Sequence, residues 1–170
     1  QVVRVVVVSA DKTPPIIQLV GGDTIIEVNG TPAYVLQGYS AYDPPLNTNY
    51  TSSVVVTGTF NQKVLGVYNI TYYVVDIDGN PATKIRKITV RDSKAPVLKL
   101  TGMDTVKIGV YTKYIDPGYT VTDNYQKTLV VDIMGSVDTA KTGTYLLHYS
   151  CTDSSGNKSA MLMRTVIVQD

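Results

Sequence analysis

The sequence GVYNITYYVVDIDGN, at residues 66–80, returns as GTYLLHYSCTDSSGN at residues 143–157. The glycines, tyrosines, aspartate and asparagine that the two stretches share all keep the same spacing of 77 residues. A long-range repeat of this kind predicts two copies of one structural unit. Within each copy, one set of alternate residues is apolar or aromatic, which is typical of a β-strand with one buried face.

The alternation also selects tyrosines for structural roles. We expect four of them on the core face: Tyr68, Tyr72, Tyr145 and Tyr149. The Gly-x-Tyr sequence that opens each strand resembles the tyrosine corner of immunoglobulin-like folds, in which the hydroxyl bonds to the upstream backbone. The closing Asp-x-x-Gly-Asn predicts a turn, because glycine and asparagine tolerate positive φ and the aspartate accepts backbone N–H bonds.

The composition excludes several classes of function. Fifteen basic and fourteen acidic residues give a net charge of +1, so nothing indicates nucleic-acid binding or an anionic membrane. Thirteen tyrosines, no tryptophan and many Val, Thr and Ile residues favour strands over helices. No apolar run is long enough to span a membrane, and we identify no signal peptide in these residues. A single cysteine excludes an intrachain disulfide.

The repeat sets the expected domain boundaries at residues 11–91 and 92–170. Each domain begins with Asp-x-x-x-Pro, at Asp11 or Asp92, and ends in an apolar strand that starts at Arg86 or Arg164. Residues 1–10 resemble these closing strands, and we interpret them as the last strand of a preceding repeat or a short imitation of one. The expected fold is all-β, with two tandem immunoglobulin-like β-sandwich domains. Further strands are expected at residues 16–20, 25–28, 54–56, 97–100, 106–108 and 129–131.

The combined motifs resemble a known family. The second repeat carries Asp-x-x-x-Pro from Asp92, Tyr-x-Asp-Pro-Gly-Tyr at residues 114–119, the long stretch at 143–157, and Arg-x-Val-x-Val-x-Asp at 164–170. This pattern resembles the bacterial surface-protein Ig-like domains, a hyalin-repeat-like family found in tandem on secreted and cell-surface proteins. The first repeat departs from it, because residues 35–37 read Val-Leu-Gln where the second repeat has Ile-Asp-Pro. The resemblance implies an extracellular stalk or spacer whose partners are neighbouring repeats, with no catalytic residues to carry over.

The closing hairpin of each repeat contains an aspartate and an arginine on opposite sides of the turn. Asp76 and Arg86 lie five residues to either side of Pro81. We therefore predict a cross-strand ion pair between them, and a matching pair between Asp153 and Arg164. The second hairpin has one extra residue, which predicts a β-bulge.

Acidic residues at the two turns suggest weak calcium sites. In an immunoglobulin-like sandwich the last hairpin lies at the end where the first strand begins, so the two sets of oxygen ligands can meet there. A calcium ion there would stiffen the joint between repeats. The alternative is a hydrogen-bonded turn without metal, and no other cofactor is expected. The candidate ligands are Asp11, Asp76 and Asp78 in the first repeat, and Asp92, Asp153 and Asn157 in the second.

No motif for catalysis is present, and we expect that the protein is not an enzyme. Cys151 falls on the core face, while His148, the single histidine, falls on the opposite face and cannot serve as its base. Asp116 and Asp123 form an acid pair of the kind that glycosidases use, but loop carboxylates on a small sandwich are more often solvated turn residues.

Two functions remain open at this stage. The first is a non-catalytic structural spacer or stalk module of an extracellular surface or fibre protein. The alternative is an adhesin module that binds a carbohydrate, such as a cell-surface glycan, or a protein partner through exposed aromatic rings. The tyrosines considered for that surface are Tyr39, Tyr42, Tyr50, Tyr73, Tyr111 and Tyr125.

Overall fold

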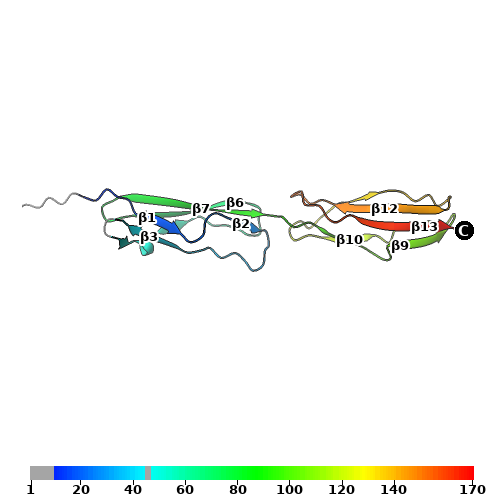
Figure 1. The fold of residues 1–170 in the computed structure, drawn as a ribbon, viewed down its shortest axis with the longest axis horizontal. Helices are drawn as coiled ribbons and strands as arrows, with labels where there is room; N and C mark the ends of the chain where they lie inside the picture. The colour runs from blue at the N-terminus through cyan, green and yellow to red at the C-terminus, as the bar shows by residue number, and fades with distance from the viewer. Residues whose placement is uncertain (1–9, 45–46) are drawn as a thin grey trace, which may run out of the picture. The chain divides into compact units, whose positions relative to one another are not determined.

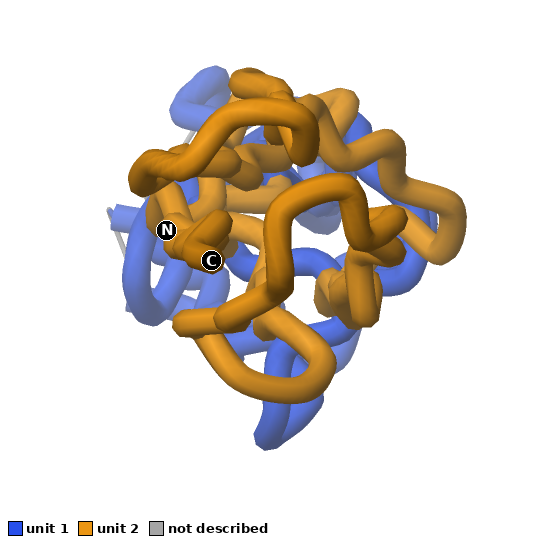
Figure 2. Tube along the Cα trace, turned by 90° about the vertical axis from the view of Figure 1, so that its right-hand side faces the viewer, with its two compact units in different colours: residues 1–91 blue, residues 92–170 orange. Residues whose placement is uncertain are grey.

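The structure is a computed structural model that describes residues 10–44 and 47–170. The chain forms two compact units that divide between Arg91 and Asp92, coloured blue and orange in Figure 2. The strand expected within residues 1–10 lies, apart from Ala10, outside the described residues. We call the two parts unit 1 and unit 2 and describe each by itself.

Unit 1 is a two-layer β-sandwich. One sheet has the strand order β1-β3-β4 and the other the order β2-β7-β6-β5. The elements are β1 (Ile16–Leu19), β2 (Thr24–Glu27), β3 (Tyr39–Asp43), β4 (Thr48–Asn49), a short 3₁₀ helix (Thr51–Ser53), β5 (Val55–Thr57), β6 (Gly66–Val75) and β7 (Pro81–Arg91) (Figure 1).

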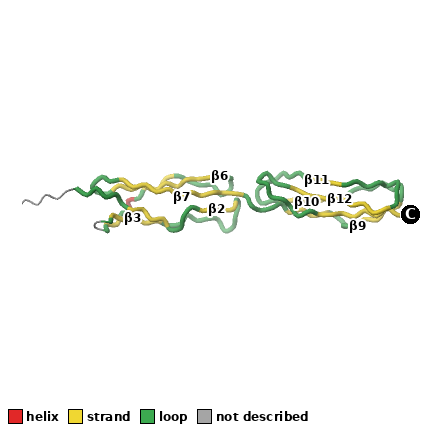
Figure 3. Tube along the Cα trace, turned by 45° about the horizontal axis from the view of Figure 1, so that its top comes forward, coloured by secondary structure: helices red, strands yellow, loops and turns green. Residues whose placement is uncertain are grey.

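Unit 2 repeats this architecture. Its larger sheet has the order β11-β12-β13-β9, which matches β5-β6-β7-β2 of unit 1, and its smaller sheet pairs β10 with β8. The strands are β8 (Val97–Leu100), β9 (Thr105–Gly109), β10 (Tyr119–Thr122), β11 (Val131–Met134), β12 (Gly143–Cys151) and β13 (Leu162–Gln169). Strands joined by loops make up both units, with the short 3₁₀ helix of unit 1 in red, as Figure 3 shows. No helix of the described residues has the length and apolar character needed to span a membrane.

The core of each unit lies between its two sheets. In unit 1, Ile17 of β1 and Ala41 of β3 pack with Ile70, Tyr72 and Val74 of β6. In unit 2, Leu98, Leu147, Tyr149, Cys151 and Val166 form the equivalent cluster. The alternation expected from the sequence is therefore the one observed, and the all-β fold with two immunoglobulin-like sandwiches is confirmed.

The first segment of each unit contributes to both sheets. β1 pairs with β3 in the smaller sheet, and the chain then crosses over so that β2 runs parallel to β7 in the larger one. In unit 2, β8 pairs with β10 and β9 runs parallel to β13. In each unit, the first strand of the larger sheet in sequence order is therefore hydrogen-bonded to the last strand of the unit: β2 to β7, and β9 to β13.

Two of the expected strands lie slightly earlier in the sequence than the structure has them. Strands were expected at residues 54–56 and 129–131, whereas β5 covers Val55–Thr57 and β11 covers Val131–Met134. Val54 is buried in the core ahead of the β5 ladder. At both places the apolar residues used for the prediction include ones that contact the core, and the hydrogen-bonded strand begins one or two residues later than predicted.

A glycine follows each of these edge strands at a position where no other residue fits. Gly58 has φ +91° and Gly135 has φ +107°. A Cβ atom at either position would overlap a backbone carbonyl oxygen of the neighbouring long strand, that of Asn69 or Leu146. Glycine therefore allows the edge strand to leave the sheet while the backbones stay in contact.

Candidate functional site

The tyrosines of the repeated strand divide into two kinds. Tyr72 and Tyr149 are fully buried at 0% exposure, whereas Tyr68 and Tyr145 are half-buried. The Tyr68 hydroxyl donates to the carbonyl of Val64, and the Tyr145 hydroxyl donates to the carbonyl four residues upstream of it, each at 3.0 Å. This is the bond of a tyrosine corner, formed once in each unit.

An arginine lies inside the core of unit 2. The side chain of Arg164 on β13 is 0% exposed and forms an ion pair with Asp116. Its guanidinium also donates to the carbonyls of Thr101 at 2.6 Å and Gly118 at 3.2 Å, and lies 5.6 Å from the ring centre of Tyr149. The Tyr149 hydroxyl donates to the second oxygen of Asp116. We call this set of contacts the arginine anchor of unit 2; it ties the large sheet to the start of β10.

Unit 1 has the same anchor without the carboxylate. Arg86 is also 0% exposed and donates to the carbonyls of Gln37 at 2.6 Å, Val20 at 2.8 Å and Gly38 at 3.1 Å. Its guanidinium lies 5.5 Å from the ring centre of Tyr72. Leu36 stands two residues before Gly38, where unit 2 has the aspartate, and no carboxylate of the described residues pairs with this arginine.

The hydroxyl of Tyr72 shows the consequence of that difference. It is buried and has no hydrogen-bond partner in the described part of the chain, whereas the equivalent hydroxyl in unit 2 bonds to a carboxylate. Burial raises the pKa of both tyrosines, and in unit 2 the bonded carboxylate of Asp116 raises the pKa of Tyr149 further.

The predicted ion pairs Asp76–Arg86 and Asp153–Arg164 are wrong. In the observed register Arg86 lies opposite Ile70, and Arg164 lies opposite Leu147. The turn is centred before Pro81, and the backbone N–H of Asp76 bonds to the carbonyl of Asn80. The arginine is therefore six residues from the residue that faces Asp76, roughly 20 Å along the strand.

The second hairpin contains the extra residue that the sequence indicated. Thr152, just after β12, lies three positions beyond Tyr149, whereas their partners Lys158 and Leu162 lie four positions apart. The Ser159 hydroxyl accepts a bond from the Cys151 N–H at 3.0 Å within this irregular segment.

The two aspartates of the hairpin turns hold the turns closed. Both carboxylate oxygens of Asp153 accept bonds from Asn157, from its backbone N–H and its side-chain amide, each at 2.8 Å. Asp76 accepts the same two bonds from Asn80, also at 2.8 Å. Burial alone would raise the pKa of both aspartates, but these hydrogen bonds, together with bonds from the other backbone N–H groups of the turn, outweigh it and lower the pKa of each below its ordinary value.

Three carboxylates meet at this turn in unit 2. One oxygen each from Asp92, Asp123 and Asp153 lies within 4.8 Å of the others. The Asn157 amide bridges the turn to the Asp92 carbonyl at 3.4 Å, and the Ser155 hydroxyl donates to the Asp92 carboxylate at 3.3 Å. We call the three carboxylates the acidic cluster of unit 2.

Unit 1 places aspartates from the same three segments near its own turn, although among the described residues the spacing within 4.8 Å is found for the unit 2 carboxylates and not for these. The Asn80 amide donates to the Asp76 carboxylate and, at 3.1 Å, to the Asp11 carbonyl. Asp43, the last residue of β3, is 6% exposed. We call Asp11, Asp43 and Asp76 the acidic cluster of unit 1. Asp78 is exposed, and the corresponding residue of unit 2 is Ser155.

The structure thus brings Asp11 and Asp76 of the first predicted set together, and Asp92 and Asp153 of the second, and adds one residue to each; Asp78 is exposed, and Asn157 bonds to Asp153 within the turn. Asp43 and Asp123 were missing from the sets proposed from the sequence. They hold matching positions 80 residues apart, each shortly after a Gly-Tyr pair, and that spacing was the signal for them. Asp123, once considered as an acid pair with Asp116, belongs to the acidic cluster, while Asp116 belongs to the arginine anchor.

The one cysteine and the one histidine are apart, as the strand alternation indicated. Cys151 is 1% exposed in the core, and burial raises the pKa of its thiol. His148 is half-buried on the other face of β12, opposite Met134 and Met163.

Few of the tyrosines considered for a stacking surface are exposed. Of the six considered for a stacking surface, Tyr73 in unit 1 and Tyr111 in unit 2 are exposed, at 42% and 81%. The other four are half-buried: Tyr39, Tyr42, Tyr50 and Tyr125.

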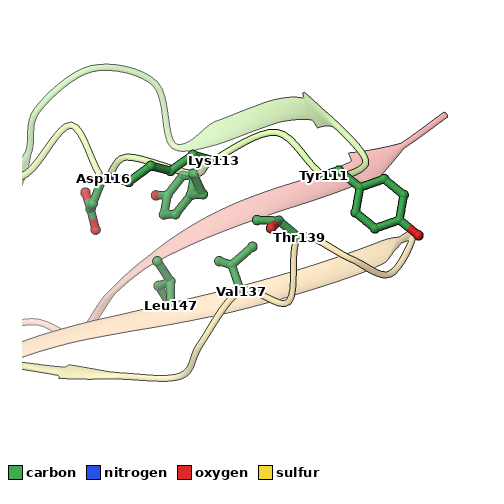
Figure 4. Close-up of a pocket in the computed structure, with 7 residues that line it drawn as sticks. Tyr111, Lys113, Asp116, Val137, Thr139 and Leu147 are labelled. Atoms are coloured by element: carbon green, nitrogen blue, oxygen red, sulfur yellow. The ribbon is translucent and has the colours of Figure 1, made fainter.

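A shallow hollow of about 550 Å³ lies beside Tyr111. Figure 4 shows Tyr111 at one end of it and Asp116 towards the other, with Lys113, Val137 and Thr139 between them. Tyr111 has φ +62°, an unusual conformation for a residue with a side chain.

Comparison with protein families finds a matching model. The model for "Bacterial surface protein, Ig-like domain" matches residues 17–90 and again residues 98–168. Among curated proteins, an uncharacterised 81.3 kDa protein of Acholeplasma phage L2 is 29% identical over 135 residues. That alignment covers 74% of this chain but 18% of the phage protein.

Several solved structures are similar over most of the chain at low identity. ZmpB of Clostridium perfringens, solved as its M60 catalytic domain with two CBM51 domains, is 14% identical with a TM-score of 0.45; the match covers 93% of this chain and 31% of that one. A lipoprotein of Bacteroides thetaiotaomicron is 14% identical with a TM-score of 0.41, over 91% and 80%. The fibronectin(III)-like modules of CbhA from Clostridium thermocellum are 14% identical with a TM-score of 0.38, over 91% and 94%.

Proposed function

The chain belongs to the bacterial surface protein Ig-like domain family, and on that premise we propose that it is a load-bearing spacer of an extracellular surface protein. In this role the two units hold another part of the protein away from a surface and carry out no chemistry. Their partners are neighbouring repeats of the same chain.

The parallel pairing of end strands supports this role most directly. In unit 2, tension along the chain pulls β9 towards its N-terminal end and β13 towards its C-terminal end. Because these strands are parallel, such tension slides one along the other and loads all the bonds between them together. The ladder is extended at its two ends by Thr165 N–H to the Asp104 carbonyl at 2.7 Å and by Val110 N–H to the Gln169 carbonyl at 2.9 Å. β2 and β7 form the same arrangement in unit 1.

The distribution of aromatic residues gives further support. A stacking surface for sugars requires neighbouring exposed rings. The two exposed tyrosines of the set considered, Tyr73 and Tyr111, lie in different units. Neither unit by itself presents two exposed rings of this set, which is the pattern expected for a spacer.

Force spectroscopy on the intact chain tests the proposal. Val106→Pro removes an N–H from the middle of the β9–β13 ladder, because the bonds at residues 104 and 110 place alternate residues toward β13. We expect this variant to lower the rupture force of one of two unfolding events. The control is Asp132→Pro on β11, an exposed position on a strand that pairs only with β12. An equal loss of force in both variants would contradict a load-bearing role for the parallel pair.

The hollow beside Tyr111 supports a second candidate, an adhesin module. It combines an exposed ring with Lys113, Asp116 and Thr139, which is the mixture of aromatic and polar groups that binds sugars. A glycan array probed with the intact chain and with Tyr111→Ala tests this function. Binding by the unaltered chain that the substitution removes supports it, and absence of binding by either chain leaves the spacer alone.

A further inference from the structure

We propose that unit 2 binds one calcium ion through Asp92, Asp123 and Asp153, and that unit 1 carries a second copy of this site. The proposal is independent of the spacer function, because a spacer can work without a bound ion and a calcium site can form in a protein that bears no mechanical load. The ligands of each site come from three separate segments: the start of the unit, the end of β3 or β10, and the turn of the long hairpin.

The geometry of the acidic cluster in unit 2 suits a single ion. Oxygen ligands of calcium lie 2.3–2.6 Å from the ion, so two of them on opposite sides are separated by about 5 Å. The three carboxylate oxygens of the cluster lie within 4.8 Å of one another, inside that limit. Oxygen is the only ligand type in the cluster, which favours a hard cation such as calcium over zinc.

Buried carboxylate oxygens without a hydrogen-bond donor favour the binding of a cation. The Asp123 Oδ1 accepts bonds from the N–H groups of Tyr125 and Gln126, each at 2.8 Å, but its Oδ2 is buried and has no partner among the described residues. A buried carboxylate oxygen without a donor is costly unless a cation binds it. Within the described chain, none of the three aspartates forms an ion pair with a lysine or arginine.

Unit 1 shows the same feature more strongly. The Asp43 side chain is 6% exposed, and its Oδ1 has no partner in the described part of the chain. A buried carboxylate oxygen without a donor thus occurs at matching positions of both repeats, on Asp43 in unit 1 and Asp123 in unit 2, and such an oxygen is unfavourable without a cation.

The repeat itself argues against coincidence. The two units differ in the arginine anchor, where Leu36 stands for Asp116, yet each keeps three aspartates and one asparagine at the hairpin turn. The asparagine amides are already used to hold the turns, so the carboxylates remain to meet the ion.

Calcium titration of the intact chain, freed of metal by chelation, tests the proposal by calorimetry and thermal unfolding. We expect two ions per chain, with dissociation constants of about 10⁻⁴–10⁻³ M, as in other extracellular modules. At ten times that concentration, calcium should raise the melting temperature by about 5–10 °C, and magnesium by much less. Terbium gives a third reading, because Tyr125 adjoins the cluster and can sensitise its emission.

Isosteric variants locate the sites. Asp123→Asn and Asp43→Asn should each remove one of the two binding events, or weaken it at least about tenfold, because each loses one of the charges that bind the ion. Asp104→Asn is the control, an exposed aspartate outside both clusters. The calcium-free melting temperature of each variant shows whether it folds, and Asp92→Asn replaces Asp123→Asn if the latter does not.

Three outcomes would overturn the proposal. They are an unchanged melting temperature at 10 mM calcium, an equal response to magnesium, and binding that survives in a folded Asp43→Asn, Asp123→Asn double variant. None of these bears on the force experiment, so failure of the calcium site and failure of the spacer role can be told apart.

Discussion

Replacing Asp116 by asparagine would remove the counter-charge of a buried arginine with almost no change of shape. The carboxylate forms an ion pair with Arg164 and accepts the hydroxyl proton of Tyr149. Asparagine keeps one oxygen and therefore one of these two bonds. The guanidinium keeps its carbonyl partners Thr101 and Gly118, as the arginine of unit 1 does with its own carbonyls.

The expected cost follows from the burial of the two partners. Breaking a fully buried ion pair costs about 3–5 kcal/mol, because one charge is left without compensation. Here the arginine is 0% exposed but the aspartate side chain is 28% exposed, so water already weakens the pair. With one hydrogen bond retained, we expect unit 2 to lose about 2–3 kcal/mol of its free energy of unfolding.

Hydrogen exchange of the intact chain measures this loss unit by unit. Peptides from β12 and β13 report on unit 2, and peptides from β6 and β7 provide the internal reference. A loss of 2–3 kcal/mol corresponds to exchange of the protected amides that is about 30- to 150-fold faster. Asp104→Asn removes the same charge from an exposed site and serves as the matched control.

Two results would refute the reasoning. If exchange in β12 and β13 changes less than about threefold, the carbonyls and the Tyr149 ring suffice to hold the arginine. If Asp104→Asn has the same effect, net charge rather than the arginine anchor determines the stability of unit 2.

Three further predictions concern backbone, pH and thiol chemistry. Gly135→Ala should lower the free energy of unfolding of unit 2 by at least about 3 kcal/mol, because the new methyl group meets the backbone of β12. Gly156→Ala, at φ +90° but with open space around it, should cost about 1–2 kcal/mol. Urea unfolding measures both losses, and equal losses would contradict this prediction. Burial, followed by the charges of neighbouring aspartates, raises the pKa of Asp92. In the presence of a chelator, the urea midpoint of unfolding should therefore rise as the pH falls from 7 towards 3.8, and should then fall at lower pH as Asp153, whose pKa is lowered, becomes protonated. A midpoint that falls steadily from pH 7 would contradict this prediction. Cys151 should react with a thiol reagent only as fast as unit 2 opens, so urea should accelerate labelling; complete labelling of the folded chain on mixing would count against a buried thiol.

Local patterns in the sequence predicted the parts of the structure that depend on neighbours along the chain. The alternation of residues 66–75 identified the buried face of β6, since side chains of a strand alternate whatever its partners are. The Asp-x-x-Gly-Asn motif gave the turn for the same reason, because Asp76 and Asn80 bond to each other. The bond of Tyr68 to Val64 spans four residues and was expected from the Gly-x-Tyr motif.

Contacts between distant segments were the part that sequence reasoning missed. The predicted Asp76–Arg86 pair assumed a turn centred on Pro81, and a small shift of that centre moved the arginine far from the aspartate. Asp43 and Asp123 join their clusters through the folding of the smaller sheet onto the hairpin, which no short motif records. The aspartate that does pair with Arg164 is 48 residues away, in the Tyr-x-Asp-Pro-Gly-Tyr motif, where no sequence pattern indicated an ion pair.

The parallel pairing of β9 with β13 has a consequence for how length is encoded. Asp92, the first residue of unit 2, lies at the hairpin turn that precedes β13, and Gln169 ends that strand. The chain therefore enters unit 2 at one end of the sandwich and leaves it at the opposite end. A domain whose two termini lie at opposite ends can be followed by another copy without a reversal of the chain between them. The reach of such a protein is then set by counting: duplicating a stretch of roughly 80 codons adds one module's height, and deleting it subtracts the same amount.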